Sequence, residues 1–411
     1  MIFDELKLKP KWSIYPRKVA RLANPEQAIR EALLHPVGTP PLAEMCRRGS
    51  RVVILVDDGT RPTPQKLILP ILLDELNRAG VRDKDVTIIV GLGVHRPMTE
   101  EEMKARFGAQ VVSRVGAVLN HDCRDEACEH MGTTASGVPI SVNREFLKAD
   151  FKIAVGSIVP HIYAGWGGGA KMIQPGISST VTTTAVHRLA NIHLHEILAT
   201  TDNIVRKEME EIAHRVGLAF IVNCIVDSAG ELVKVVAGDV VKAHREGVRF
   251  AEGVFCWRNL EPVDIVLAST PCHATDLWQS TKSLVVATRG VKQGGTVILV
   301  APCPEGVAPG HPILLELGDR SFDEVLGMVD RHEVSDTVGA LTYMTIARCK
   351  EKCRITVVSQ KLEREQLTKI GLGYAATAKE ALDEALAYHR ASTSTEPTLG
   401  IVYEAGELAI I

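Results

Sequence analysis

Several features that would assign a protein to a special class are scarce or absent in this chain of 411 residues. No apolar run is long enough to cross a bilayer. The N-terminal residues lack the basic start and apolar stretch of a signal peptide. The formal net charge of −3 includes no excess of basic residues, which argues against nucleic-acid binding. We therefore expect a cytoplasmic protein with neither nucleic acid nor membrane as a partner.

Aromatic residues are also few, at 4% of the chain. The core must therefore consist mostly of Val, Leu, Ile and Ala, which favours helices packed on parallel strands. Four of the nine cysteines form two close pairs, Cys123 with Cys128 and Cys349 with Cys353. Neither pair has CxxC spacing, and the odd total favours free thiols over disulfides.

Short apolar runs alternate with helical patterns, and Gly or Pro marks the joints between them. Arg51–Val56, for example, reads as a buried strand, and Lys66–Ala79 then shows helical spacing. This alternation predicts an α/β protein of two domains, each a mostly parallel sheet covered by helices. We predict an N-terminal domain of residues 1–261, which residues 398–411 could complete, and a C-terminal domain of residues 262–397.

The same patterns predict the remaining elements. Further strands are expected at Val86–Leu92, Ala117–Asn120, Phe151–Val155, Val263–Ala268, Thr296–Val300 and Ile355–Val358, and a strand pair at Leu218–Val226 and Leu232–Ala237. Helices are expected after the capping box at Thr99, over Asn203–Arg215, from Asp239 to Glu252, and over Leu277–Thr288, Phe322–Val329, Thr337–Cys349 and Ala378–His389.

Ligands of such sheets bind at the carboxyl ends of strands, where loops begin. The loop Asp57–Pro64 leaves a buried strand directly. In it, Gly59 allows a tight turn or a close approach to a ligand. Asp58 could accept hydrogen bonds from ribose hydroxyls, and Arg61 could bind phosphate or carboxylate. A capped turn with an internal ion pair is the simpler alternative.

Histidines occur at two further places. His95 follows two glycines in the loop Gly91–Pro97, where a structural and a catalytic role are about equally open. His187, His193 and His195 lie close together after a Ser/Thr-rich run. Imidazole is the commonest ligand of zinc, copper, nickel and iron, but one histidine needs further ligands to hold a metal, which a cofactor could provide.

The most unusual segment is Pro160–Lys171, in which four of the five residues from Gly165 to Gly169 are glycine. A flexible linker would be polar and would lack the Trp, Tyr and Ile found here. A glycine-rich loop that follows a strand and ends at a lysine resembles a phosphate cradle. It is not a Walker A motif, because the spacing differs and Met172 replaces the hydroxyl residue. Lys171 could act as a charge or as a covalent nucleophile.

A last pair lies in the second domain. Gln279 and Lys282 are at positions i and i+3 of a predicted helix, so they share one face. They could bind an anion, although an ordinary helix surface is the better explanation of this pair taken by itself.

Together these residues resemble the nickel-pincer lactate racemase family, whose members interconvert stereoisomers of 2-hydroxyacids. The resemblance covers nearly the whole chain. It rests on Asp58-Gly59-Thr60-Arg61-Pro62, Gly93-Val94-His95-Arg96, the segment Pro160–Gly176 with His161 and Lys171, His187, and Gln279-Ser280-Thr281-Lys282. Family members often carry Tyr where this chain has Trp278.

The resemblance implies a role for each matching residue. Lys171 would hold the cofactor, pyridinium-3-thioamide-5-thiocarboxylic acid mononucleotide, through a thioamide, and His187 would bind its nickel. His95 and His161 would be the acid–base pair. The other implied roles are ribose and phosphate binding by Asp58, Gly59, Thr60 and Arg61, and substrate carboxylate binding by Gln279 and Lys282, with Arg61 shared.

The implied enzyme is a 2-hydroxyacid racemase or epimerase with its active site in the interdomain cleft. Its partners would be a small 2-hydroxyacid and, transiently, the enzymes that make the cofactor. A carbanion next to an ionised carboxylate is unfavourable, so hydride removal with a histidine as base is the sounder route. The alternatives are a zinc hydrolase that uses His187, His193 and His195, and a nucleotide-ligand binding protein without turnover.

Overall fold

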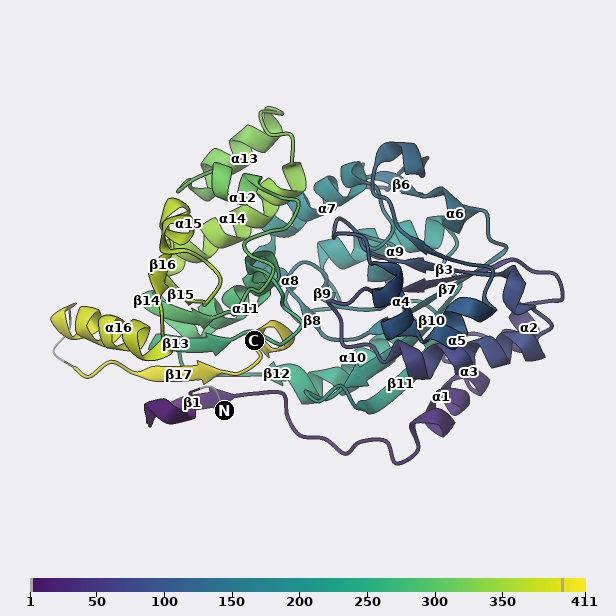
Figure 1. Cartoon of the computed structure of the whole chain (residues 1–411), viewed down its shortest axis with the longest axis horizontal. Coiled ribbons are helices and arrows are strands. Elements are labelled where there is room, and N and C mark those ends of the chain that lie inside the picture. Colours follow the sequence, from purple (N-terminus) through teal and green to yellow (C-terminus); the bar gives the residue numbers. More distant parts are fainter. Residues whose placement is uncertain (1–2, 393–394) are drawn as a thin grey trace. The chain divides into compact units, whose positions relative to one another are not determined.

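The computed structural model describes residues 3–392 and 395–411. These residues form two compact units, neither of which is continuous in sequence. The N-terminal unit consists of Lys18–Val159 and Tyr163–Val254. The C-terminal unit consists of residues 3–17, Pro160–Ile162 and Phe255–Ile411. Figure 1 labels the helices and strands of both.

The N-terminal unit contains a six-stranded sheet in the order β11-β10-β7-β2-β3-β4. Its neighbouring strands are parallel except β10 and β11, which form the predicted pair in antiparallel orientation. The strands are β2 (Val52–Val56), β3 (Val86–Val90), β4 (Ala117–Asn120), β7 (Phe151–Ser157), β10 (Phe220–Val226) and β11 (Leu232–Gly238). A separate antiparallel hairpin is formed by β5 (Cys128–Thr133) and β6 (Pro139–Asn143).

Those helices of this unit that were predicted begin and end near the predicted positions. Thr99 and Glu102 form the predicted capping box, and Asn203 caps the helix after it. The helices are α1 (Pro25–Leu34), α2 (Leu42–Met45), α3 (Gln65–Arg78), α4 (Glu100–Phe107), α5 (Ala109–Arg114), α6 (Arg144–Leu147), α7 (Thr180–Ile192), α8 (Leu194–Ile197), α9 (Ile204–Arg215) and α10 (Lys242–Phe255). Short elements are η2 (Asp83–Asp85), η3 (Asp125–Ala127), β9 (Gly165–Trp166) and η4 (Gly169–Met172).

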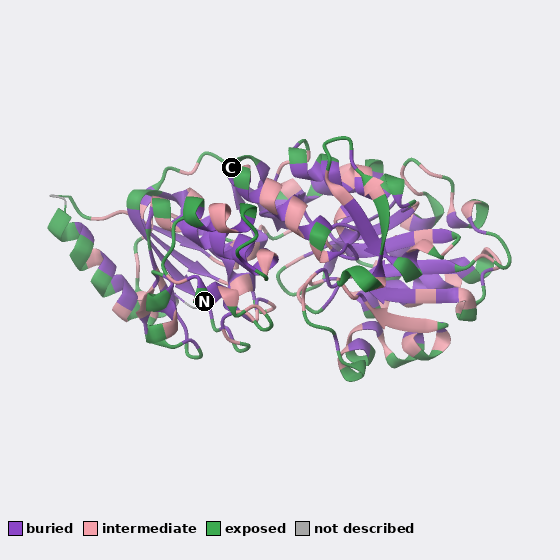
Figure 2. Cartoon of the chain, turned by 90° about the horizontal axis from the view of Figure 1, so that it is seen from above, coloured by how far each residue is buried: buried purple, intermediate pink, exposed green. Residues whose placement is uncertain are grey.

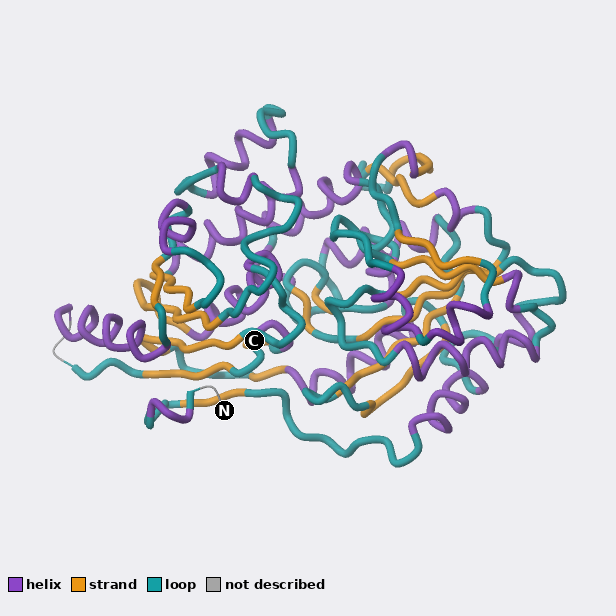
Figure 3. The backbone as a smooth tube through the Cα atoms, in the orientation of Figure 1, coloured by secondary structure: helices purple, strands orange, loops and turns teal. Residues whose placement is uncertain are grey.

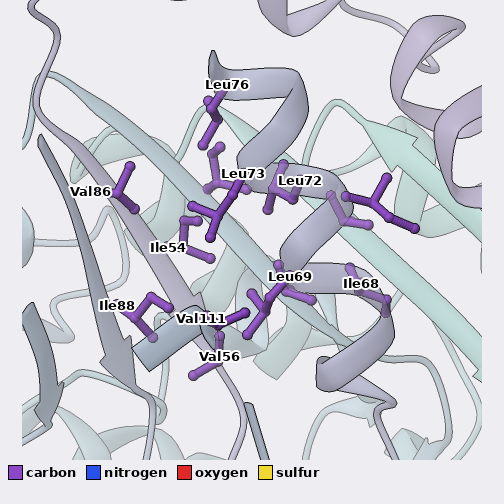
Figure 4. Close-up of a cluster of buried hydrophobic side chains, with 14 of the residues drawn as sticks. Ile54, Val56, Ile68, Leu69, Leu72, Leu73, Leu76, Val86, Ile88 and Val111 are labelled. Atoms are coloured by element: carbon purple, nitrogen blue, oxygen red, sulfur yellow. The ribbon is translucent and has the colours of Figure 1, made fainter. Parts of the chain in front are cut away.

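Aliphatic side chains make the core of the N-terminal unit, as the low aromatic content predicts. Every residue of β2 is buried, because helices cover both faces of a parallel sheet. Ile68, Leu72 and Leu76 recur at helical spacing along α3 and pack in the same cluster as sheet residues such as Ile54 and Ile88 (Figure 4). Exposed residues lie on the outer sides of helices and in loops (Figure 2).

The C-terminal unit contains a second six-stranded sheet, in the order β1-β17-β13-β14-β15-β16, and all its neighbours are parallel. The strands are β1 (Trp12–Ile14), β13 (Val263–Ser269), β14 (Val291–Val300), β15 (Arg354–Val358), β16 (Gly373–Ala375) and β17 (Leu399–Val402). The helices are α11 (Leu277–Gly290), α12 (Ile313–Glu316), α13 (Phe322–Asp330), α14 (Thr337–Lys352), α15 (Arg364–Lys369) and α16 (Ala378–Ser392). Short elements are η1 (Asp4–Leu6), β8 (Pro160–His161), β12 (Cys256–Trp257), η5 (Ala405–Glu407) and β18 (Ala409–Ile410).

Both ends of the chain differ from the predicted domain division. Residues 398–411 do not complete the N-terminal domain, because β17 pairs with β13 in the C-terminal sheet. Residues 3–17 join the same sheet through β1, which pairs with β17. Gly400 allows this packing, since a Cβ there would lie 2.4 Å from the Trp12 ring. A short apolar strand carries no sign of its distant partner, which is why the pattern alone did not place it.

Figure 3 shows the strands of each sheet side by side, with helices beside them. The α/β class with mostly parallel sheets is therefore confirmed. Each of the nine cysteines is a free thiol, as the odd count predicted. Among the described residues, no helix is both long and apolar enough to span a membrane.

Candidate active site

Three neighbouring strands of the N-terminal sheet end in polar residues. Asp57 and Asp58 follow β2, the His95 loop follows β3, and Ser157 ends β7. The chain moves from β2 to β3 and β4 on one side and later to β7 on the other, so the strand order reverses at β2. Ligands of open α/β sheets bind at such a switch point.

Asp57 anchors the loop that follows β2. Its buried carboxylate accepts hydrogen bonds from Arg106 Nη2 and Gln65 Nε2, both at 2.7 Å, and from the Thr63 hydroxyl. Arg106 Nη2 also donates to the carbonyl of Arg61 at 3.0 Å. An ion pair therefore exists, as in the simpler alternative, but it is formed by Asp57 and Arg106. Asp58 takes no part in it and is available for other contacts.

Asp58 holds His95 in place. Its buried Oδ2 lies 2.7 Å from His95 Nδ1. Burial opposes the negative charge, but His95, Arg61 and Thr60 outweigh it and keep the pKa of Asp58 well below its usual value. Because an ionised carboxylate only accepts, Nδ1 carries the hydrogen, and Nε2 is the ring nitrogen left to exchange a proton. His95 is thus oriented as a base.

The next three residues of the loop are Gly59, Thr60 and Arg61, and the space beside Gly59 is open. The backbone N–H of Thr60 donates to Asp58 Oδ1 at 3.0 Å, and Arg61 Nη1 donates to the Thr60 carbonyl at 2.8 Å. No atom lies within 4 Å of the position that a Cβ of the exposed Gly59 would take. A ligand can therefore approach this backbone closely, as the sequence predicts.

The glycine-rich segment is packed around a buried arginine that the sequence analysis missed. Arg206 of α9 is fully buried. Its guanidinium donates to the carbonyls of Ala164 and Gly168, at 3.2 and 3.4 Å, and to that of Trp166. Burial lowers the pKa of Arg206 to about 10, so it remains charged at neutral pH.

Two other side chains complete this packing. His244 Nε2 lies 2.8 Å from the Gly167 carbonyl, and Asn223 Oδ1 accepts from the Gly169 N–H at 2.9 Å. A Cβ on Gly165 would lie 1.9 Å from the Thr200 carbonyl oxygen. The glycines therefore make room for the protein's own groups, and the predicted phosphate cradle is wrong in this respect.

Lys171 emerges from this segment on η4 and is half-buried. Burial, with Arg61 nearby, holds the pKa of its amine well below the ordinary value, and the opposing effect of Asp58 is smaller. Within the described residues its Nζ makes no hydrogen bond or ion pair. The lowered pKa favours the uncharged amine, which is the nucleophilic form of a lysine.

His187 lies near Lys171 on α7, with its Nδ1 buried and without a partner among the described residues. Burial lowers its pKa to about 3, and Lys171 and His95 are close enough to act in the same direction. The ring is therefore neutral at physiological pH and has a lone pair for a metal.

Several unpaired polar atoms lie in the stretch of sequence that contains these two residues. A buried polar group without a partner is costly, so each such atom calls for a ligand or a water molecule. Within the described residues between 157 and 187, six such atoms occur: Ser157 Oγ, Trp166 Nε1, Gln174 Nε2 and Oε1, Thr183 Oγ1 and His187 Nδ1.

The zinc alternative has less structural support. His193 is the C-terminal cap of α7 and lies 3.4 Å from Glu196, and His195 lies on the short α8. Among the residues described, no group of three or more His, Cys, Asp and Glu side chains could hold a metal ion. His187, His193 and His195 are therefore not such a group.

The remaining predicted residues belong to the C-terminal unit. His161 is buried on β8. Gln279 and Lys282 lie in the first turns of α11, which follows β13, and Lys282 Nζ donates to Gln279 Oε1 at 2.5 Å. The predicted shared face is confirmed by this bond. It holds a cation and an amide together, a combination that suits a carboxylate.

The fold and these residues define an α/β protein of two units, with a histidine held by a buried carboxylate and a lysine whose pKa is lowered by burial. The family models for the lactate racemase N-terminal and C-terminal domains match residues 4–198 and 259–398. The lactate racemase of Thermoanaerobacterium thermosaccharolyticum is 34% identical over 287 residues, which cover 68% of this chain and 66% of that protein. The lactate racemase of Lactiplantibacillus plantarum is 29% identical over 379 residues, covering 88% and 86%.

Solved structures agree with these relatives. The lactate racemase apoprotein from T. thermosaccharolyticum superposes with a TM-score of 0.85 at 27% identity, covering 95% of this chain and 94% of that one. A Thermotoga maritima protein matches in fold, with a TM-score of 0.76 at 20% identity, over 94% and 98% of the chains. This chain belongs to the lactate racemase family and is an isomerase.

The buried guanidinium yields a stability prediction. Replacing it in Arg206→Met removes the buried donor that three carbonyls share, which should cost about 3 kcal/mol or more. The apparent Tm should therefore fall by roughly 6–12 °C for a unit of this size. The control is Lys207→Met, the exposed neighbour, which should change the free energy of unfolding by no more than about 0.5 kcal/mol. Equal melting of the two variants would contradict this role of Arg206.

Proposed function

We propose that this protein inverts the C2 stereocentre of a small 2-hydroxyacid, with the nickel-pincer nucleotide as its cofactor. The observation that carries the proposal is the proximity of Lys171 and His187, two groups whose pKa values are lowered by burial, to the Asp58–His95 pair. Family membership supports it, because the named relatives are lactate racemases. When bound, the cofactor, pyridinium-3-thioamide-5-thiocarboxylic acid mononucleotide with nickel, supplies an acceptor and donor of hydride.

The residues present fit that cofactor. The Lys171 amine has a lowered pKa and is unpaired within the described residues, which suits a covalent thioamide tether. The neutral His187 ring has a lone pair for nickel. Asp58 to Arg61 would hold the ribose and phosphate beside the open space at Gly59.

Two histidines would move the hydroxyl proton. His95, oriented by Asp58, accepts the proton from one enantiomer as the C2–O bond becomes a carbonyl, and His161 does so for the other. Loss of a proton from C2 is avoided, since the adjacent carboxylate would destabilise a carbanion. When the 2-oxoacid is reduced on its other face, the second histidine gives its proton to the new hydroxyl, so each histidine is the base in one direction and the acid in the other.

Substrate orientation would depend on the cationic group of α11. Lys282, held by its bond to Gln279, binds the substrate carboxylate together with the Gln279 amide, and Arg61 contributes a second cation. Because the 2-oxoacid has the same carboxylate, these groups retain it while it turns its other face. The proposal therefore requires residues of both units to meet one substrate.

The proposal extends to how the cofactor is loaded and where in the cell the protein is found. Loading of the cofactor requires transient contact with the enzymes that make it. The nine free thiols are typical of a reducing compartment, which supports a cytoplasmic location.

The metal assignment predicts different effects of two histidine substitutions. His187→Ala should lose nickel from protein co-expressed with the cofactor-making enzymes, because it removes the only ligand that the proposal assigns to the protein. His193→Ala should keep nickel near the wild-type level, since His193 is a helix cap beside Glu196. Elemental analysis of the purified proteins measures both. Stoichiometric zinc that is lost in His193→Ala would favour the hydrolase.

The reaction itself predicts where the C2 hydrogen goes. Loaded enzyme incubated with single enantiomers of 2-hydroxyacids in D2O should destroy optical purity while the C2 hydrogen stays on the substrate. Chiral chromatography and proton NMR measure the two quantities. His95→Gln and His161→Gln should each slow racemisation about 10²- to 10⁴-fold, the usual contribution of a general base. Deuterium at C2 appearing as fast as racemisation would overturn the hydride route.

A further inference from the structure

Tyr163 packs directly against the imidazole of His187. The two ring centroids are 4.8 Å apart and the ring planes differ by 55°. Tyr163 comes just after the start of the glycine-rich segment, and its side chain is buried. The contact therefore joins the segment that carries Lys171 to the helix α7 that carries His187.

A second contact connects the same residues. Asn191 lies one turn after His187 on α7, and its Nδ2 donates to the His187 carbonyl at 3.1 Å and to the Tyr163 hydroxyl at 3.4 Å. The bond to the hydroxyl is long and hence weak. The ring contact is consequently the stronger restraint on the imidazole.

His187 lacks the usual support of a metal-binding histidine. Such a ring almost always donates its second N–H to a carboxylate, a carbonyl or water, which fixes its orientation. His187 Nδ1 is buried and has no protein partner among the described residues. Without such a bond to the protein, the packing of neighbouring side chains must fix the orientation of the ring.

We propose that Tyr163 is a positioning residue, which holds the His187 imidazole in the orientation that binds nickel. The aromatic ring of Tyr163 does this, and its hydroxyl does not. This inference rests on the proposed role of His187 as the nickel ligand. It predicts that the aromatic ring at position 163 controls how long nickel is retained, whereas the hydroxyl contributes little.

The test measures nickel loss from the loaded protein. Wild type, Tyr163→Phe, Tyr163→Leu, His187→Ala and the distant, exposed control Tyr15→Leu are each prepared with the cofactor-making enzymes. Excess EDTA is added, and the nickel that remains is followed by elemental analysis after desalting. Thermal melting of each variant reports separately whether the fold is intact.

The expected pattern separates ring from hydroxyl. Tyr163→Leu should lose nickel about 10- to 100-fold faster than wild type, as is common when the support of a metal ligand is removed. Tyr163→Phe and Tyr15→Leu should stay within about twofold of wild type. A folded Tyr163→Leu with the wild-type rate would overturn the inference. Tyr163→Phe losing nickel as fast as Tyr163→Leu would do the same, because the hydroxyl would then be decisive.

His187→Ala distinguishes failure of this inference from failure of the proposed function. If His187→Ala loads and keeps nickel like wild type, His187 is not the ligand and both proposals fall. If His187→Ala loses nickel while the Tyr163 variants retain it, the ligand assignment stands and only the positioning role fails. Should Tyr163→Leu fail to fold, the Tyr163→Phe rate still decides whether the ring suffices.

Discussion

A single buried guanidinium organises the candidate site. Arg206 gathers the carbonyls of Ala164, Trp166 and Gly168 around one charge, and the chain can turn this tightly only because its glycines have no side chains. Lys171 follows immediately, so its position depends on that turn. Helix α9 therefore fixes the position of the glycine segment, and the segment in turn fixes the position of the Lys171 amine.

Burial then sets the charge of each group according to its partners. The side chains of Lys171 and His187 have no hydrogen-bonding partner among the described residues, and burial lowers the pKa of each, which favours their uncharged forms. Asp58 is also buried but contacts His95, Arg61 and Thr60, and it stays ionised. One environment thus favours an uncharged amine and imidazole and keeps a carboxylate ionised beside His95, which is the combination that the proposed chemistry needs.

The sequence predicted what depends on local pattern. Most strands of both sheets and the capping box at Thr99 followed from periodicity and motif, whereas a shared site for Lys171 and the loop of Asp58 was implied by the family resemblance. What was missed depends on contacts between distant residues. The pairing of β17 with β13 has no local signature, and Arg206 looks like any charged residue of an amphipathic helix until the carbonyls around it are known. The glycines were recognised, but their purpose was not, since a glycine that admits a ligand and one that admits protein look the same.

The central claim is that burial holds the pKa of the Lys171 amine well below that of an ordinary lysine. Competitive acetylation of the cofactor-free protein with acetic anhydride, followed by peptide mass spectrometry from pH 6 to pH 11, measures it directly. The reactivity of Lys171 should level off well below pH 10.5, whereas that of the exposed Lys207 should keep rising toward that value. The shape of each profile gives the pKa, whatever the accessibility of the amine. Parallel profiles for the two lysines would contradict the account.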